Sequence, residues 1–167
     1  MSNTPANVHL QEVINGAVDI RPSNAAMRRV RAKNTQPELR VRRLLHGLGY
    51  RYRLHRRDLP GTPDIVFPGR RKVIFVHGCF WHGHSCPNGE RTPRSNQRYW
   101  DPKLARNRTR DAEAQCDLQR LGWSVLIVWE CEIPDLETNP DRLIAFLDGA
   151  NGETLSQERR AASTTDR

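Results

Sequence analysis

Apolar residues in the first half of the chain recur at the spacing of one helix face. These residues are Leu39, Val41, Leu44, Leu45 and Leu48. Thr35 can cap this helix, because Pro37 falls in the first turn and Glu38 stands three residues after the cap, as in a capping box. We predict a helix that ends by residue 49, preceded by a shorter helix over 23–30.

Strand patterns follow this helix. Residues 50–54 alternate tyrosine with arginine before a leucine, which predicts a strand with one exposed, basic face. Residues 65–67 form a short apolar run. Residues 73–76 form a continuous apolar run, as expected for a central strand that is buried on both faces. Residues 123–129 form the other strongly apolar strand.

The remaining segments are polar. Residues 79–97 are rich in His, Cys, Gly, Pro and Asn and predict a long irregular segment. A polar helix is expected from about 96 to 121, bent at Pro102, and a last helix is expected to end near 149. This order of elements predicts an α/β fold with a mixed central sheet flanked by helices.

The two ends of the chain differ from its middle. Residues 1–22 and 151–167 are rich in Ser, Thr, Asn, Gln and charge and have no apolar period, so we expect disordered extensions. Residues 23–150 would then form one domain. No apolar run approaches ~18 residues and no signal-peptide pattern is present, so we expect a soluble intracellular protein without a membrane span.

Positive charge is concentrated in one segment. The chain has 27 basic and 19 acidic residues, a formal net charge of +8. Residues 21–57 alone hold twelve basic residues and a single acid, Glu38. Such a dense arginine block favours a nucleic acid bound through its phosphates, with Arg40 and Arg43 as candidate contacts. The alternative is a solvated helix face.

Thiol and imidazole groups are spaced as metal ligands. Cys79, His84 and Cys86 lie close together, and Cys131 follows the second long apolar strand. If the two apolar strands are neighbours, the four side chains can form a closed, structural zinc site. Disulfides are less favoured in a reducing compartment, and incidental loop residues are the alternative. Cys116 is left over, and we expect it to be buried on its helix.

A carboxylate and a histidine are expected at the same sheet edge. Asp64 begins the strand at 65–67 and His77 ends the next, so a tight turn would place them side by side. Asp64 could hold Mg²⁺, with the Val76 carbonyl as a second ligand, while His77 and His82 could handle water or protons. Such a metal neutralises charge during phosphodiester hydrolysis.

Two large aromatic residues, Phe80 and Trp81, lie among the metal-ligand candidates. Aromatic residues in an irregular loop usually pack into the core. A loop stiffened by metal can also hold apolar wedges that unstack DNA bases. The residues alone leave both interpretations open.

Together these motifs resemble those of the very short patch repair (Vsr-type) DNA mismatch endonucleases. The resemblance runs from Met27 to about Leu147. Its most specific parts are Leu-Pro-Gly-Thr-Pro-Asp at 59–64, the segment 73–86 and the segment 121–131. It implies the restriction-endonuclease core fold, in which Phe75-Val76-His77 replaces the usual lysine-containing motif.

The resemblance also implies roles for single residues. Asp64 and the Val76 carbonyl would bind Mg²⁺, and Glu38 and His77 would contact the water that this ion holds. His82 would be the general base or proton shuttle, supported by Asp111. The structural zinc ligands would be Cys79, His84, Cys86 and Cys131.

On DNA, the resemblance implies that Phe80, Trp81 and His82 enter the duplex from one groove and Met27 from the other, on either side of a T:G pair. Lys103 and Asn107 match positions near the mispair. The implied reaction is a Mg²⁺-dependent nick of one strand, 5′ to the mismatched T that deamination of 5-methylcytosine leaves opposite G.

We therefore expect a monomeric endonuclease of double-stranded DNA, cytoplasmic and nucleoid-associated when bound, with a functional link to a cytosine methyltransferase. Two alternatives remain. One is a sequence-specific endonuclease of the same fold that acts on paired DNA, and the other is a zinc-stabilised DNA-binding module without catalysis. Asp64 with His77 favours an enzyme, because binding alone needs no carboxylate facing the phosphates.

Overall fold

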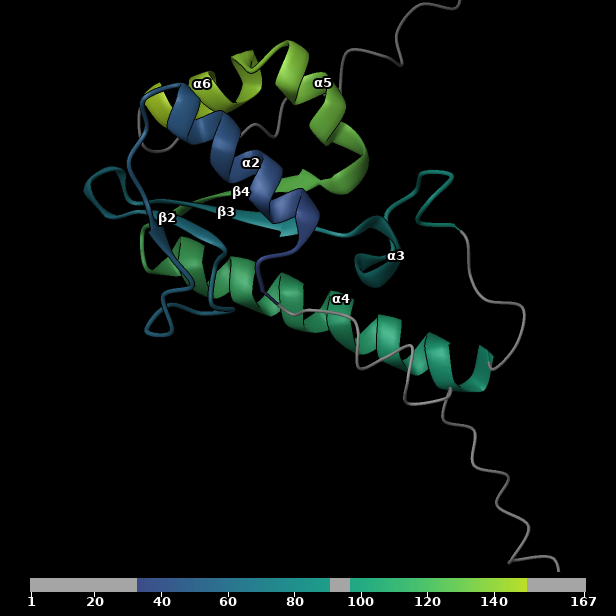
Figure 1. The fold of residues 1–167 in the computed structure, drawn as a ribbon. Helices are drawn as coiled ribbons and strands as arrows, with labels where there is room; N and C mark the ends of the chain where they lie inside the picture. Colours follow the sequence, from purple (N-terminus) through teal and green to yellow (C-terminus); the bar gives the residue numbers. More distant parts are fainter. Residues whose placement is uncertain (1–32, 91–96, 150–167) are drawn as a thin grey trace, which may run out of the picture.

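The computed structural model describes residues 33–90 and 97–149 (Figure 1). Its helices are α2 (Gln36–Gly47), α3 (Cys79–His82), α4 (Gln97–Arg120), α5 (Ile133–Thr138) and α6 (Asp141–Asp148). Its strands are β1 (Arg53–Leu54), β2 (Ile65–Phe67), β3 (Lys72–His77) and β4 (Ser124–Trp129). The expected helix over 23–30, Met27 and the two expected extensions lie outside the described residues.

Helix α2 begins at the predicted capping box. The Thr35 hydroxyl accepts a hydrogen bond from the Glu38 backbone at 3.3 Å, and the Glu38 carboxylate accepts one from the Thr35 backbone at 3.4 Å. On the inner face of the helix, Val41 and Leu45 are fully buried. Each such side chain stabilises the fold by about 1.5–3 kcal/mol relative to an exposed one, so the packing fixes the helix on the sheet.

The four strands form one mixed sheet in the order β1-β2-β3-β4. The first three strands are antiparallel, whereas β3 and β4 are parallel and paired from Lys72↔Ser124 to His77↔Trp129. A parallel pair needs a crossover, and α4 supplies it. The carboxyl ends of β3 and β4 therefore meet at one edge of the sheet, and the predicted mixed α/β fold is confirmed.

Helices cover both faces of this sheet. Helices α2, α5 and α6 lie on one face and α4 on the other (Figure 1). Alternate residues of β2 and β3 enter the two layers: Ile65 and Ile74 pack under α2, while Val66 and Val73 pack against Leu118 of α4. This double burial explains why the strand at 73–76 has no polar alternation.

Two expectations about exposure and length were wrong. The strand expected at 50–54 contains only Arg53–Leu54, which pair with Val66 and Ile65. Tyr50 and Tyr52 precede it and place their rings edge-on against Phe67, at 6.3 and 6.1 Å. Cys116 is exposed rather than buried. It lies two residues from both Ala114 and Leu118, the buried positions of α4, and therefore points away from the sheet.

Two helices were not expected. The segment predicted to be irregular, 79–97, opens with α3, a single turn that ends at Gly83 with a φ of +68°. Helix α5 follows β4 through the short turn at Glu130–Glu132 and buries Ile133 and Leu136 in the α2 layer. None of the helices in 33–90 and 97–149 is both long and apolar enough to cross a membrane.

Candidate active site and metal centre

An open cleft of about 710 Å³ lies at the carboxyl end of β3. The sequence-predicted residues that line it are Glu38, Asp64, Val76, His77, Trp81, His82, Asn107 and Asp111. They come from α2, the start of β2, the end of β3, α3 and α4. The fold therefore gathers side chains that are up to 73 residues apart, from Glu38 to Asp111, around one cavity.

Asp64 is bound to the backbone of β3. Its Oδ2 accepts a hydrogen bond from the Val76 N–H at 2.8 Å. Burial raises the pKa of this carboxyl, although the Val76 N–H and the nearby His55 and Arg42 oppose the shift. A carboxylate that is costly to bury without a positive partner is suited to holding a cation.

The prediction that Asp64 lies beside His77 was wrong. Because Ile65 pairs with Ile74, Asp64 lies just past the end of the ladder, level with Phe75 and Val76 rather than with His77. This register nevertheless favours the expected pair of metal ligands, Asp64 and the Val76 carbonyl. The N–H and C=O of one strand residue point to the same edge, so the Val76 carbonyl shares the edge on which Asp64 lies.

His77 and His82 form a stacked pair on the other side of the cleft. Their ring centroids are 3.8 Å apart and the planes differ by 11°. His77 is only 6% exposed, and this burial together with the electrostatic influence of the adjacent His82 lowers the pKa of His77 to about 4. His77 is therefore a neutral imidazole at neutral pH.

Asp111 holds His82 in place. The His82 Nδ1 lies 2.5 Å from the Asp111 Oδ2, and the partners belong to α3 and α4. Although burial opposes it, this hydrogen bond lowers the pKa of Asp111, which stays ionised. With Nδ1 engaged by a carboxylate, Nε2 is the ring nitrogen of His82 that can exchange a proton.

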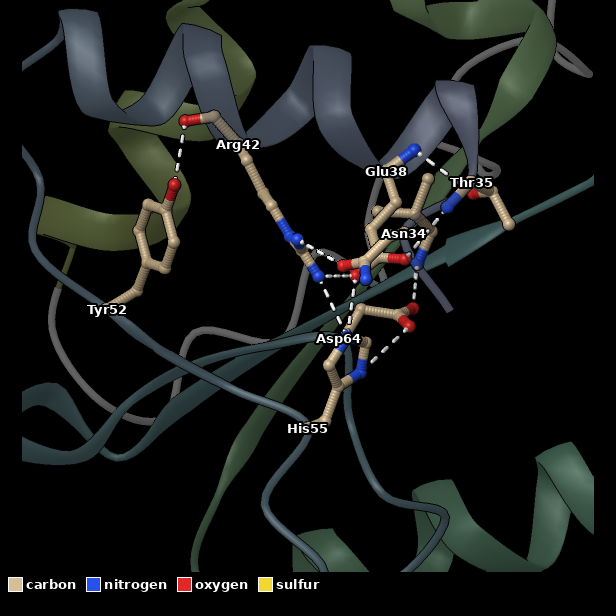
Figure 2. A network of polar contacts seen from close by, with 8 residues as sticks. Asn34, Thr35, Glu38, Arg42, Tyr52, His55 and Asp64 are labelled. Atoms are coloured by element: carbon tan, nitrogen blue, oxygen red, sulfur yellow. Dashed lines mark hydrogen bonds and ion pairs between the residues drawn. The ribbon is translucent and has the colours of Figure 1, made fainter. Parts of the chain in front are cut away.

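Glu38 has partners that the sequence did not reveal. It is 2% exposed and accepts a charged hydrogen bond from Arg42, while His55 Nε2 lies 3.0 Å from its Oε1 (Figure 2). Arg42 stands one helical turn after Glu38, a spacing that signals such a pair, but the surrounding arginine block concealed it. His55 adopts a left-handed φ of +48° after β1, and no sequence pattern identifies it.

A second cluster lies beside the cleft. The candidate ligand atoms of Cys79, His84, Cys86 and Cys131 all lie within 4.8 Å of one another. The strand register explains this convergence, because Cys79 and Cys131 each stand two residues after the paired residues His77 and Trp129. The ring of His84 also stacks on Trp129 at 4.3 Å.

The chemistry of this cluster fits a divalent metal. Burial and the neighbouring thiols of Cys79 and Cys86 raise the pKa of Cys131 to about 12, so the chain alone disfavours three thiolates together. A bound cation would remove that repulsion. Three sulfur donors and one imidazole form the closed donor set that is typical of structural zinc.

The loop after α3 packs closely around this cluster. The Gly89 N–H lies 3.4 Å from the Cys86 sulfur, and a Cβ at Gly89 would collide with the His84 carbonyl. A glycine is therefore required for the loop to close at this point.

Phe80 and Trp81 are half-buried on α3. Among the described residues, neither joins the two hydrophobic layers of the sheet. They pack instead on Trp100 of α4, with ring centroids 5.5 and 5.8 Å away. The Lys103 ammonium lies 5.4 Å from the centre of the Trp81 ring, and the Asn107 amide donates to the Trp81 carbonyl at 3.1 Å.

The described part of the basic segment is not uniformly free. Arg40 forms a two-pronged ion pair with Glu137, at 2.9 and 2.5 Å, and Arg42 is buried beside Glu38. Arg43 is exposed. Of the two candidate phosphate contacts, Arg43 is thus the more accessible, because Arg40 must compete with Glu137.

Comparisons with known proteins agree with these features. A family model described as DNA mismatch endonuclease Vsr matches residues 19–88. The type II nicking enzyme V.XorIIP of Xanthomonas oryzae pv. oryzae is 57% identical over 122 residues, which is 73% of this chain and 89% of that protein.

Two further relatives are similar. The type II nicking enzyme V.NmeAIP of Neisseria meningitidis is 40% identical over 117 residues, covering 70% of this chain and 83% of the relative. The DNA mismatch endonuclease Vsr of Escherichia coli is 41% identical over 118 residues, covering 71% of this chain and 75% of the relative. This chain belongs to the Vsr family of DNA mismatch endonucleases.

Proposed function

We propose that this endonuclease hydrolyses one strand of double-stranded DNA 5′ to the mismatched T of a T:G pair, with Mg²⁺ as cofactor. One observation carries the proposal. A single cleft has the carboxylates of Asp64 and Glu38 on one side and the His82–Asp111 pair on the other. We call the side of the cleft formed by Asp64 and Glu38 the acidic wall. A wall that can hold a cation, together with an oriented imidazole, is what water-dependent phosphodiester cleavage requires.

The acidic wall fits Mg²⁺ rather than a softer metal. Asp64 and the Val76 carbonyl offer oxygen donors, which Mg²⁺ prefers, and a site with few protein ligands leaves room for water. When bound, Mg²⁺ supplies charge neutralisation at the scissile phosphate. Glu38 adds a second carboxylate within the same cleft.

On the opposite wall, His82 accepts the proton of the attacking water at Nε2. Asp111 fixes the orientation of its ring through Nδ1 and favours the imidazolium that forms. His77 stays neutral and supports the ring of His82 from one face. The water oxygen forms the new P–O bond as its proton passes to His82. The P–O bond to the strand on the other side of the nick breaks, and its leaving oxygen takes up a proton from solvent water.

The aromatic pair supports recognition of a mispair. Phe80 and Trp81 stand on a one-turn helix between β3 and the cysteine cluster, and we propose that zinc bound by Cys79, His84, Cys86 and Cys131 stiffens this segment. A T:G pair is easier to unstack than a matched pair, so a rigid aromatic wedge favours it. Lys103, Asn107 and Arg43 would contact the DNA around it.

The lesion also suggests where this reaction stands. A T opposite G arises when 5-methylcytosine loses its amino group, so the substrate depends on earlier methylation of cytosine. We propose that the enzyme acts as a monomer after a cytosine methyltransferase has modified the site.

A second candidate function has a specific observation in its favour. Two of the three relatives described above are named type II nicking enzymes, which suggests sequence-specific nicking. Nicking assays on end-labelled duplexes separate the two functions. The first predicts cleavage of T:G duplexes with Mg²⁺ and none with EDTA or on the matched duplex, whereas equal cleavage of matched duplexes would favour the second.

A further inference from the structure

Arg42 is held by contacts to both its guanidinium and its backbone. One Nη donates to the Asn34 side-chain oxygen at 2.8 Å and the other donates to Glu38, while the Tyr52 hydroxyl donates to the Arg42 backbone carbonyl at 3.0 Å (Figure 2). Arg42 is only 8% exposed. A cation buried this far is therefore a fixed part of the acidic wall and not a DNA-binding side chain.

Arg42 determines which nitrogen of His55 carries the proton. Its Nη2 lies 2.8 Å from the His55 Nε2, and a guanidinium can only donate. Nε2 must then offer its lone pair. With its lone pair on Nε2 facing Arg42, the ring is neutral and carries its single N–H on Nδ1.

The opposite tautomer would be costly. An N–H on Nε2 would reach Glu38 Oε1 at 3.0 Å, but it would point at the N–H groups of Arg42. With the proton on Nδ1, the two hydrogens of Arg42 Nη2 are shared between Glu38 and His55. No two donors then face each other, and Arg42 Nη2 donates to both acceptors, the Glu38 Oε1 and the His55 Nε2, which lie 3.0 Å apart.

The Nδ1 of His55 faces the catalytic carboxylate. It lies 4.0 Å from the Asp64 Oδ1, while the other oxygen of Asp64 is held by the Val76 N–H. The backbone N–H of His55 also donates to the backbone carbonyl of Asp64 at 3.4 Å. If the ring moved slightly closer, its Nδ1–H would donate to Oδ1, and both carboxylate oxygens of Asp64 would accept a hydrogen bond.

We propose that Arg42 and His55 are positioning residues: Arg42 holds His55 in the Nδ1–H tautomer, so that His55 braces Asp64 instead of ligating a metal. This inference rests on the proposed function of Asp64. Glu38, His55 and Asp64 lie close enough to share an ion. With a lone pair on Nδ1, that set would favour Mn²⁺, Co²⁺ or Zn²⁺, whereas an N–H there leaves only oxygen donors and favours Mg²⁺.

Nitrogen-15 NMR of histidine-labelled protein tests the tautomer directly, because protonated and unprotonated ring nitrogens have well-separated shifts. The His55 signals are assigned by their loss in His55→Asn. The proposal expects Nδ1–H in the wild type and a shift toward Nε2–H in Arg42→Met. A wild-type His55 that carries its proton on Nε2 would overturn it, even if Arg42→Met does not fold.

The dependence of nicking on the Mg²⁺ concentration tests whether His55 orients Asp64. His55→Ala should raise the Mg²⁺ concentration for half-maximal nicking by roughly 10- to 100-fold, the usual cost of losing a group that orients a metal ligand. His55→Asn is the matched control, because its amide N–H replaces Nδ1–H and Asn tolerates a φ of +48°. It should stay within a few-fold of the wild type.

A purely structural role gives a different pattern. In that case both His55 variants would lower the melting temperature and leave the half-maximal Mg²⁺ concentration unchanged, and the proposal would fail. Arg42→Met should also raise the ratio of Mn²⁺-supported to Mg²⁺-supported nicking, and an unchanged ratio counts against it. Activity retained in Asp64→Asn would instead overturn the proposed function while leaving the tautomer result intact.

Discussion

His82 lies between a carboxylate and a second imidazole: its ring stacks on His77 at 3.8 Å while its Nδ1 meets Asp111 at 2.5 Å. This arrangement fixes the ring in position and direction. In the proposed reaction, the proton-accepting Nε2 of His82 is thereby oriented without help from the substrate, which lowers the entropic cost of reaching the transition state.

Loss of this imidazole should slow nicking without abolishing DNA binding. We expect His82→Ala to reduce the single-turnover nicking rate by about 10²–10⁴-fold, the usual contribution of a general acid–base group. Asp111→Asn should reduce the rate less and leave the affinity for DNA unchanged. Single-turnover rates and gel-shift affinities check this, and a normal rate in His82→Ala would exclude His82 as the base.

Stability should depend on pH through His77. In the unfolded chain His77 takes up a proton below about pH 6.5, but in the folded protein it does so only near pH 4. The contribution of neutral His77 to the free energy of unfolding is therefore complete above pH 6.5, and it is lost as the pH falls toward 4. Relative to His77→Phe, which never charges, the wild type should lose up to about 3 kcal/mol between pH 7 and pH 4. Urea unfolding at several pH values measures this, and a constant difference between the two proteins would be inconsistent with a buried neutral His77.

The cysteine cluster should contain zinc. Elemental analysis should find about one zinc per chain, and Cys131→Ser should lower the free energy of unfolding by about 4 kcal/mol or more, because structural zinc contributes directly to folding. Cys116→Ser is the control, since Cys116 is exposed and outside the cluster. A folded protein without zinc would mean that these cysteines are ordinary thiols.

Trp81 should matter for the mispair more than for affinity. A base stacked on an aromatic ring gains about 1–3 kcal/mol, so Trp81→Ala should slow nicking of T:G duplexes roughly 5- to 150-fold and leave affinity for matched DNA unchanged. The fluorescence of 2-aminopurine beside the mismatch should rise with the wild type and stay low with the variant. Equal fluorescence from both, with zinc retained, would show that Trp81 only packs on Trp100.

The fold and the cysteine cluster could be predicted for a shared reason. The two apolar runs at 73–76 and 123–129 identify the central strands, and a helix between them makes a parallel pair. Such a pair places Cys79 and Cys131 at one edge whatever the details of the loops. The resulting architecture is the restriction-endonuclease-like fold of the Vsr family.

The acidic wall could be predicted only in part. The place of Asp64 depends on the register of β2 against β3, which a turn of uncertain length does not fix, and it was misjudged by about two residues. The sequence did not distinguish Arg42 from the other arginines of segment 21–57, although Arg42 is buried. His55 was missed because its position results from a left-handed backbone turn, which leaves no periodic signal.

The most direct test of the proposed function is nicking of a T:G duplex and its matched C:G counterpart by the wild type and by Asp64→Asn. The wild type and Asp64→Asn should have the same zinc content, the same melting temperature and the same affinity for the T:G duplex. Since a bound metal contributes several kcal/mol to the transition state, we expect Mg²⁺-dependent nicking of the T:G strand by the wild type and a loss of about 10³-fold or more in Asp64→Asn. Wild-type rates in Asp64→Asn, or nicking that persists in EDTA, would contradict the assignment of this cleft as a metal-dependent active site.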